Sequence, residues 1–343
     1  MEKKQPILDG IDPEIMGRLV TRRDAIRKGA SVSSFVAAGL ALGSVPVTLA
    51  ALAKDVFGQA PSDILDALQF AFILENLENE FYKAVLGTSD VAAQNTAFAP
   101  VRALIPASAM AVFQQIQKHE QEHARYLREV AIPLFGGTAP TITANDFDFT
   151  GGNGAGNGPF AGATTNLDFL LLAAQAFEDT GVRAYKGQAG RFLIANNRNA
   201  DIALEDALRI HSVEARHAAR IRRIRRQREQ GNTAVRFSGY VRDGGLPAAG
   251  PGTNITPAPP QAVLDALALI YAREENTMHT FFNDVTNLPI TVDTATMPGV
   301  TVVGTGETQR LAATMSFDEP LTKDEVIAIV RNFIKDDASR GLP

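Results

Sequence analysis

The chain of 343 residues contains no cysteine. Disulfide bonds, Cys-ligated zinc, iron–sulfur clusters and thiol nucleophiles are therefore all excluded. Any metal ion that the protein binds must be held by oxygen atoms and imidazole nitrogens. The chain also lacks an excess of positive charge, since its formal net charge is −5. This balance argues against binding nucleic acid over a broad basic surface. We expect small molecules, metal ions or proteins as partners, and no nucleic acid.

Long uncharged stretches are scarce too, and residues 29–53 form the one run that is long enough to span a bilayer. Arg22 and Arg23 precede it, and this order resembles a Tat-type export signal. Gly, Ser, Thr and Pro46 make the run weakly hydrophobic, which suits a cleaved signal better than a permanent anchor. We therefore expect residues 1–53 to be a signal segment and the mature protein, without a membrane span, to lie in the periplasm or cell envelope. Cleavage near residue 60 and an uncleaved anchor are the alternatives.

Four segments carry apolar residues at helical spacing. They are Ser62 to Gly87, about Pro106 to Val130, Leu167 to about Asn196, and about Asn199 to Gly231. The first and last connections are short, whereas about 33 residues separate the second segment from the third. A long link lets the chain return along a bundle, so that the next helix runs parallel to the last. The sequence predicts a mainly α fold, an antiparallel four-helix bundle over residues 61–230 with a long crossover between helices 2 and 3.

Residues 231–343 have a different character. They are rich in Gly and Pro as far as Pro260, and then predict a helix from about Gln261 to Asp284, a strand-like segment rich in Thr and Val, and an acidic helix from Thr322. We expect this part to be a C-terminal extension, with extra helices and some irregular or β segments, that packs on the bundle.

Two of the four predicted helices carry the motif Glu-x-x-His. Helix 2 has Glu120 and His123, and helix 4 has Glu214 and His217. A spacing of three residues places both side chains of a pair on one helix face. One such pair alone is weak evidence, because many are solvated surface pairs.

The other two helices carry a second repeated pattern. Helix 1 has Glu75 with Tyr82 seven residues later, and helix 3 has Glu178 with Tyr185 seven residues later. Each Glu lies on an otherwise apolar face, where a charged carboxylate is costly unless it is paired or bound to metal. One Glu from each of two helices, with Glu-x-x-His from the other two, is the ligand set of ferritin-like di-iron and di-manganese carboxylate sites. In this respect the sequence resembles the ferritin-like superfamily.

More narrowly, the run from Leu74 to Tyr82 resembles the exported ferritin-like proteins related to plant desiccation-associated proteins. This resemblance implies two metal ions, iron or manganese, bound by Glu75, Glu120, His123, Glu178, Glu214 and His217. It also implies that Glu120 and Glu214 bridge the ions. Tyr82 and Tyr185 would lie beside the site as hydrogen-bonding residues or electron donors.

The sequence departs from the family pattern at one place. Many ferritin-like sites have Asp directly before Glu-x-x-His to orient the opposite histidine, but this chain has His119 and Val213 there. His119 and His211 could reach the ligands, although surface or supporting roles are favoured. The orientation of the two ligand histidines is therefore left open.

Other acidic residues and histidines lie near the motifs. We expect Glu78, Glu80 and Glu122 to face solvent or to form pairs within their helices, and of these Glu78 alone has a chance of approaching the site. Glu274 and His279 mimic a ligand pattern but have no matched partner helix, so we interpret them as surface or packing residues.

These observations lead to two functional hypotheses. The first is an oxidoreductase in stress protection that acts on dioxygen or peroxide, as a ferroxidase or a manganese-catalase-like enzyme. The second is a noncatalytic stress or envelope protein that keeps the bundle. Iron storage in a cage is disfavoured by the large C-terminal extension, and a monomer or homodimer is expected instead.

Overall fold

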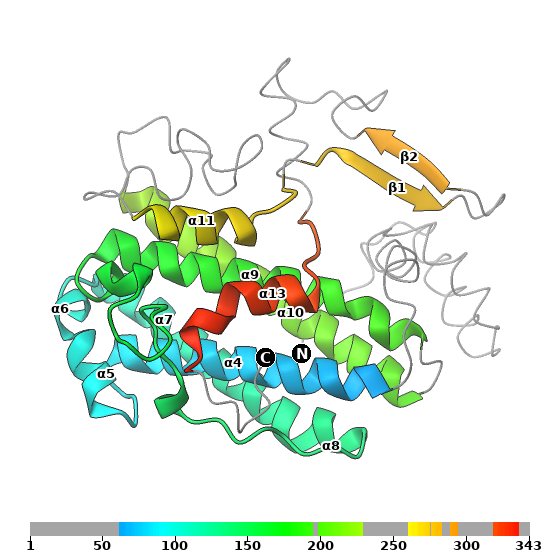
Figure 1. Ribbon diagram of the computed structural model, residues 1–343, viewed down its shortest axis with the longest axis horizontal. Coiled ribbons are helices and arrows are strands. Elements are labelled where there is room, and N and C mark those ends of the chain that lie inside the picture. The colour runs from blue at the N-terminus through cyan, green and yellow to red at the C-terminus, as the bar shows by residue number, and fades with distance from the viewer. Residues whose placement is uncertain are drawn as a thin grey trace, which may run out of the picture.

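The computed structural model describes residues 62–194, 198–228, 260–274, 276–282, 289–293 and 318–335. This part of the chain is mainly helical, and four long helices lie side by side in it (Figure 1). They are α4 (Ser62–Leu86), α7 (Ala107–Tyr126), α9 (Leu167–Ile194) and α10 (Arg198–Arg228). The segment predicted as a signal, residues 1–53, lies outside the described residues.

Contacts between side chains give the directions of the four helices. Helix α4 is antiparallel to α9, because Tyr82 contacts Glu178 while Tyr185 contacts Glu75. Helix α4 also packs antiparallel to α7, and α9 packs antiparallel to α10. Helices α7 and α9 consequently run parallel, and the long crossover joins them. The predicted ferritin-like bundle topology is confirmed.

The link between α4 and α7 contains two short helices that the sequence did not predict, α5 (Ala92–Ala97) and α6 (Ala99–Arg102). Helix α4 ends as expected at Gly87, whose φ of +82° is one that L side chains rarely adopt. Arg102 completes this end, because its guanidinium donates to the carbonyl oxygens of Val85 at 2.6 Å and Ala84 at 2.9 Å. These bonds satisfy carbonyl groups that have no partner within the helix.

Helix α7 does not stop at Tyr126 but continues through a π-helical segment, Leu127–Ala131, into the short α8 (Ile132–Leu134). Pro133 lies within α8 and has no N–H to donate to the turn before it. The wider turn of a π-helix is rare and is frequently found at functional sites.

The crossover between α7 and α9 is held by its own polar contacts. It includes two 3-10 turns, η2 (Ala144–Asp146) and η3 (Pro159–Thr164). Between them, the Asp148 carboxylate accepts hydrogen bonds from the backbone N–H groups of Gly154 and Gly156, each at 2.9 Å. The glycine-rich stretch thus folds around one carboxylate.

The C-terminal extension differs in part from the prediction. Helix α11 covers Gln261–Ile270 and does not continue to Asp284, because residues 278–282 form strand β1 (Met278–Phe282), which pairs antiparallel with β2 (Pro289–Asp293). The acidic helix is present as α13 (Lys323–Val330), with the Thr322 side chain accepting from the N–H of Glu325 at its start. The 3-10 turn η5 (Arg331–Phe333) follows it.

Buried polar contacts tie this extension to α9, and both α11 and α13 pack on that helix. Arg183 is only 1% exposed, donates to the carbonyl oxygen of Glu319 at 2.6 Å, and pairs with Glu274 at 3.2 Å. The hydroxyl of Tyr271 donates to Asp179 at 2.7 Å. Glu274 therefore has a packing role, as the sequence indicated. The predicted boundary near residue 230 lies outside the described residues and stays a prediction.

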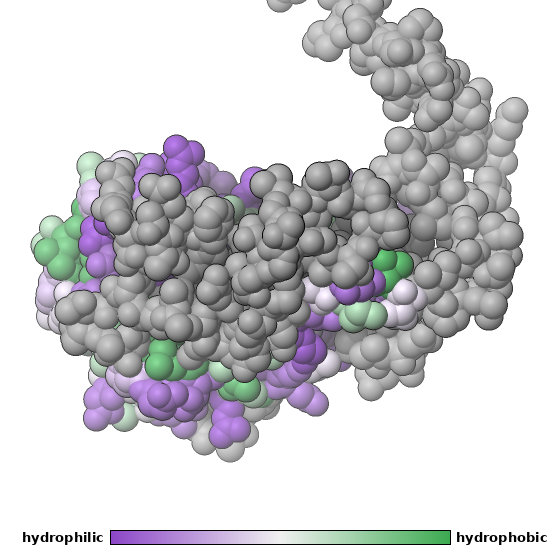
Figure 2. Space-filling view, turned by 90° about the horizontal axis from the view of Figure 1, so that it is seen from above, coloured by the Kyte–Doolittle hydropathy of each residue, from purple (hydrophilic) through white to green (hydrophobic). Residues whose placement is uncertain are grey.

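Large hydrophobic residues are exposed singly in the described part, at Leu104, Val130, Ile202, Leu269 and Met278. On the coloured part of the face in Figure 2, hydrophilic and hydrophobic residues are interspersed. Within the described ranges, no helix is both long and apolar enough to cross a membrane.

Candidate metal centre

The residues predicted to bind metal project from all four long helices into one buried cluster. Helices α4 and α9 supply one glutamate each, while α7 and α10 each supply a glutamate and, one turn later, a histidine. All four glutamates are at most 1% exposed. The cluster consists of Glu75, Glu120, His123, Glu178, Glu214 and His217.

The cluster divides into two overlapping groups. One contains Glu75 and His123, and the other contains Glu178 and His217; Glu120 and Glu214 belong to both. Within each group, the chosen ligand atoms all lie within 4.8 Å of one another. The two shared carboxylates lie where residues that bridge two ions would have to lie.

Both histidines turn the same ring nitrogen toward the carboxylates. Nδ1 of His123 lies 3.1 Å from Glu75 Oε2 and 3.1 Å from Glu120 Oε2. Nδ1 of His217 lies 3.1 Å from Glu178 Oε2 and 2.8 Å from Glu120 Oε1. The two halves of the cluster are thus related as the sequence repeat suggests.

Several of these close approaches are not hydrogen bonds. Glu120 Oε1 and both carboxylate oxygens of Glu214 are buried without a hydrogen-bond partner among the described residues, although Glu214 Oε1 lies 3.2 Å from His123 Nδ1. A cation held among these closely spaced ligand atoms would satisfy the oxygens that lack a hydrogen-bond donor. Carboxylate oxygen and imidazole nitrogen are donors that suit iron and manganese. The donor set therefore fits bound metal.

The electrostatics of the cluster without metal are unfavourable. Burial raises the pKa of Glu120 to about 7, although the neighbouring imidazoles of His123 and His217 act to lower it. Burial, with the charges of Glu120 and Glu75, raises the pKa of Glu214 well above its usual value. Although burial also opposes the charge of Glu75, His123 lowers its pKa. Carboxyl groups that must take up protons to stay buried indicate a site where cations can replace the protons.

The two predicted tyrosines lie beside the cluster, and each donates a hydrogen bond to a glutamate of another helix. The hydroxyl of Tyr82 on α4 donates to Glu178 on α9, and the hydroxyl of Tyr185 on α9 donates to Glu75 on α4. Burial raises the pKa of both phenols well above the usual value, and the neighbouring carboxylates add to this. Both tyrosines are therefore protonated hydrogen-bond donors that fix the outer carboxylates.

Glu78 is a further member of the cluster that the sequence reasoning did not assign to it. It is 4% exposed, and burial together with the charge of Glu214 raises its pKa well above the usual value. Its Oε1 and the Oε2 of Glu214 both lie over Gly181, where an added Cβ would come within 3.3 Å and 3.0 Å of them. Glu78 lies three residues after Glu75, so helical spacing was the signal that could have placed it on the same face.

His119 supports a ligand histidine. Its Nδ1 lies 2.8 Å from Nε2 of His217, the ring nitrogen that faces away from the carboxylates. Burial and the charges of His217 and His123 lower the pKa of His119. Neutral His119 can therefore accept a hydrogen bond from His217 Nε2–H and so hold Nδ1 of His217 toward the cluster. Val213, the equivalent residue before the second motif, has no polar atom with which to do this for His123.

The remaining candidates do not enter the cluster. Glu80 pairs with Lys83 at 2.9 Å and Glu122 pairs with Arg125, so both form pairs within their helices as expected. His211 is half-buried, and this burial lowers its pKa to about 4. That these six clustered residues bind metal stays a prediction.

Comparison with known proteins gives one result. Residues 63–227 match the protein family described as the ferritin-like domain. No match was found among curated proteins or among solved structures.

Proposed function

Since residues 63–227 form a ferritin-like domain, we propose that the cluster binds two iron or manganese ions and reacts with dioxygen or peroxide. The observation that carries this proposal is the pair of overlapping groups that share Glu120 and Glu214. A relation to desiccation-associated proteins, with a role in stress protection, is part of the same proposal and rests on the resemblance around Glu75 alone.

The residues of the chain have distinct tasks in this proposal. The four carboxylates and the two Nδ1 atoms hold the ions, and paired ions supply charge sharing and a template for a small oxidant. Tyr82 and Tyr185 donate to Glu178 and Glu75, which keeps these carboxylates in place. The buried setting keeps bulk water from the carboxylates, so each interaction in the cluster acts at low dielectric.

The test is metal analysis of the purified full chain, with no chelator, beside the double variant Glu120→Ala, Glu214→Ala. We expect about two iron or manganese ions per subunit in the wild type, by analogy with the dimetal class, and loss of both in the variant. Glu122→Ala is the matched control, because Glu122 lies on the same helix with an exposed side chain. Absence of metal from the wild type after reconstitution would sink the proposal.

Turnover separates the two functional hypotheses. The loaded chain is assayed for consumption of dioxygen and of peroxide. A chain that keeps its metal but consumes neither is a noncatalytic protein in which the metal only stabilises the bundle. Native mass in the same preparation should correspond to one or two subunits; a large closed assembly would instead indicate storage.

Export is a separate part of the proposal. Arg22 and Arg23 before the uncharged run support a Tat-type route to the periplasm or cell envelope. This route carries folded proteins, so the metal can be bound before export. Replacing both arginines by lysine should hold the chain inside the cell in a fractionation experiment. Unchanged export of this variant would contradict the assignment.

A further inference from the structure

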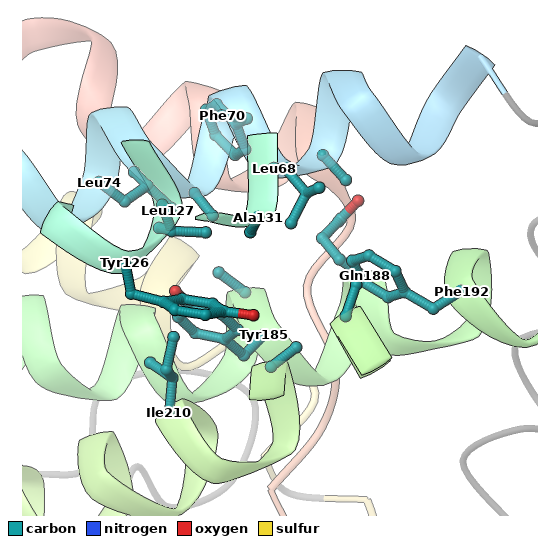
Figure 3. A pocket seen from close by; sticks show the side chains of 15 residues that line it. Leu68, Phe70, Leu74, Tyr126, Leu127, Ala131, Tyr185, Gln188, Phe192 and Ile210 are labelled. Carbon is teal, nitrogen blue, oxygen red and sulfur yellow. The ribbon is translucent and has the colours of Figure 1, made fainter. Parts of the chain in front are cut away.

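A small cavity lies inside the bundle at one end of the cluster. Its volume is ≈ 30 Å³, and side chains from all four long helices line it. Tyr185, whose hydroxyl donates to Glu75, is part of the lining, and so is Leu127, one helical turn beyond His123. In Figure 3 the labelled side chains of Leu127, Tyr126 and Tyr185 lie between α4 and the helices below it. The cavity thus lies on the side of Glu75 and His123.

The internal repeat shows why the cavity is on this side. The residue before each tyrosine is Phe81 in α4 but Ala184 in α9. The residue seven positions before each Glu-x-x-His is Phe113 in α7 but Ala207 in α10. Two aromatic side chains in one half of the bundle are therefore replaced by two alanines in the other.

These replacements account for the free volume. Phe81 and Phe113 pack against Tyr82, with ring centroids 5.2 Å and 5.7 Å from its own. Ala184 and Ala207, at the equivalent places around Tyr185, line the cavity. The two tyrosines make equivalent hydrogen bonds, so the repeat is broken in packing and not in the polar contacts.

The helix backbone also differs between the two halves of the repeat beside the cavity. The π-helical segment Leu127–Ala131 begins seven residues after Glu120, and both of its end residues line the cavity. The corresponding segment of α10, residues 221–225, continues as an ordinary α-helix. Backbone and side chains thus depart from the repeat together beside the cavity.

The chemistry of the lining restricts what can enter. Of its fifteen residues, only Tyr126, Tyr185 and Gln188 have polar side-chain atoms. Both tyrosine hydroxyls already donate to carboxylates. Gln188 is 8% exposed, has no hydrogen-bond partner among the described residues, and lies one turn further from the cluster than Tyr185. Hydrogen peroxide, with two hydroxyl groups to satisfy, is poorly served by a single amide.

We infer that this cavity is a binding site for dioxygen on the Glu75 side of the cluster, whereas the Tyr82 side is filled by phenylalanine. A volume of ≈ 30 Å³ has room for one diatomic molecule. An apolar cavity of this kind takes up small apolar molecules without having to pair polar groups. The choice of dioxygen as oxidant rests on the proposed function, but occupancy of the cavity by the gas does not need bound metal.

The test uses dioxygen itself as a paramagnetic probe of the metal-free full chain. Methyl NMR measures the relaxation enhancement that dissolved dioxygen causes at each alanine. We expect the enhancement at Ala184 and Ala207 to be several-fold larger than at Ala109 and Ala218, which are also buried but do not line the cavity. Equal enhancement at all four alanines would overturn the inference, as would methyl shifts that respond to peroxide but not to dioxygen.

Variants test whether the small alanine side chains are the cause of the free volume. Ala207→Val should abolish the excess enhancement at Ala184, whereas Ala219→Val, on the exposed face of the same helix, should leave it unchanged. Phe113→Ala should create a matching cavity beside Tyr82 and raise the enhancement at Ala109, one turn away. This second variant keeps the test decisive if Ala207→Val fails to fold.

A separate experiment measures dioxygen consumption. In the metal-loaded chain, Ala207→Val should slow dioxygen consumption without changing metal content, and Ala219→Val should do neither. Unchanged consumption with Ala207→Val would show that dioxygen reaches the cluster by another route and would overturn the inference. Absence of metal would refute the proposed function, and would leave the relaxation measurement on the metal-free chain as an independent result.

Discussion

The stability of the metal-free protein should fall as pH rises, and Glu120 allows the effect to be sized. Burial raises its pKa to about 7 from an ordinary value of 4.5. A carboxyl whose folded pKa is raised contributes stability below the unfolded pKa and loses it as pH rises through the folded pKa. Each pKa unit corresponds to about 1.4 kcal/mol, so Glu120 alone should lose roughly 2.5 kcal/mol between pH 5 and pH 8.

Other groups of the cluster act in the same direction. Glu78 and Glu214 also have raised pKa values, because of burial and neighbouring carboxylates. Burial alone would lower the pKa of His217, but Glu178 and other neighbouring carboxylates raise it to about 11. The stability that His217 contributes is therefore lost as pH rises above its unfolded pKa, near 6.5. His211 acts in the opposite direction, since burial lowers its pKa to about 4. A single pH profile therefore mixes several groups.

The variant Glu120→Gln isolates the effect of Glu120. We would measure urea unfolding of the full chain and of the variant at pH 5 and pH 8, in EDTA. At pH 5 the wild-type carboxyl is protonated and resembles the amide, so the two stabilities should nearly agree. At pH 8 the variant should be more stable, by roughly 2.5 kcal/mol. A difference that is the same at both pH values would refute the reasoning.

Manganese should reverse this order. Metal binding requires ionised carboxylates, so it is favoured at pH 8. At a free concentration of 100 times the dissociation constant, Mn²⁺ should stabilise the wild type by about 2.7 kcal/mol per site. Glu120→Gln removes a ligand that both groups share. The variant should therefore become the less stable protein when Mn²⁺ is added, and an unchanged order would argue against a cation site.

Three further predictions concern residues around the cluster and the extension. His119→Ala should weaken Mn²⁺ binding about 10- to 100-fold in a titration while leaving the fold intact, since it removes the partner of His217; unchanged affinity would contradict the orienting role. Gln188→Leu should raise the free energy of unfolding by about 1–3 kcal/mol, because both amide atoms are buried without partners; a loss of stability would mean that a water molecule satisfies them. Arg183→Met should cost about 3–5 kcal/mol in urea unfolding and more than Glu274→Gln, because it removes the ion-pair partner of buried Glu274 and the donor to several carbonyl groups; equal costs would contradict this.

The bundle and most of the cluster could be predicted because both depend on local periodicity. A glutamate on an apolar helix face is a signal that survives in the sequence, and Glu-x-x-His places two donors on one face. The connection lengths then fixed which helices run parallel. These features need no knowledge of the packing between helices.

What sequence reasoning missed depends on packing between helices. Glu78 lies among other acidic residues, and only its burial at 4% separates it from Glu122, which is exposed. The contact between His119 and His217 joins residues of two helices, so spacing along one helix cannot show it. Helix α11 ends at Ile270 although apolar residues continue beyond it, because the following chain pairs as a hairpin. Tertiary contacts override the local signal in each case.

The cavity depends on packing between helices, but the internal repeat indicates its cause, because equivalent positions in the two halves carry side chains of different size. Equivalent hydrogen bonds from Tyr82 and Tyr185 require that the two halves keep their polar residues. No such requirement applies to the apolar residues around them, so Phe81 and Phe113 have alanine counterparts without loss of the cluster. The two halves keep equivalent polar residues but differ in the apolar side chains around them. The two similar groups of residues therefore have unequal surroundings. The sides of Glu75 and Glu178 should therefore differ in access while they remain alike in ligands.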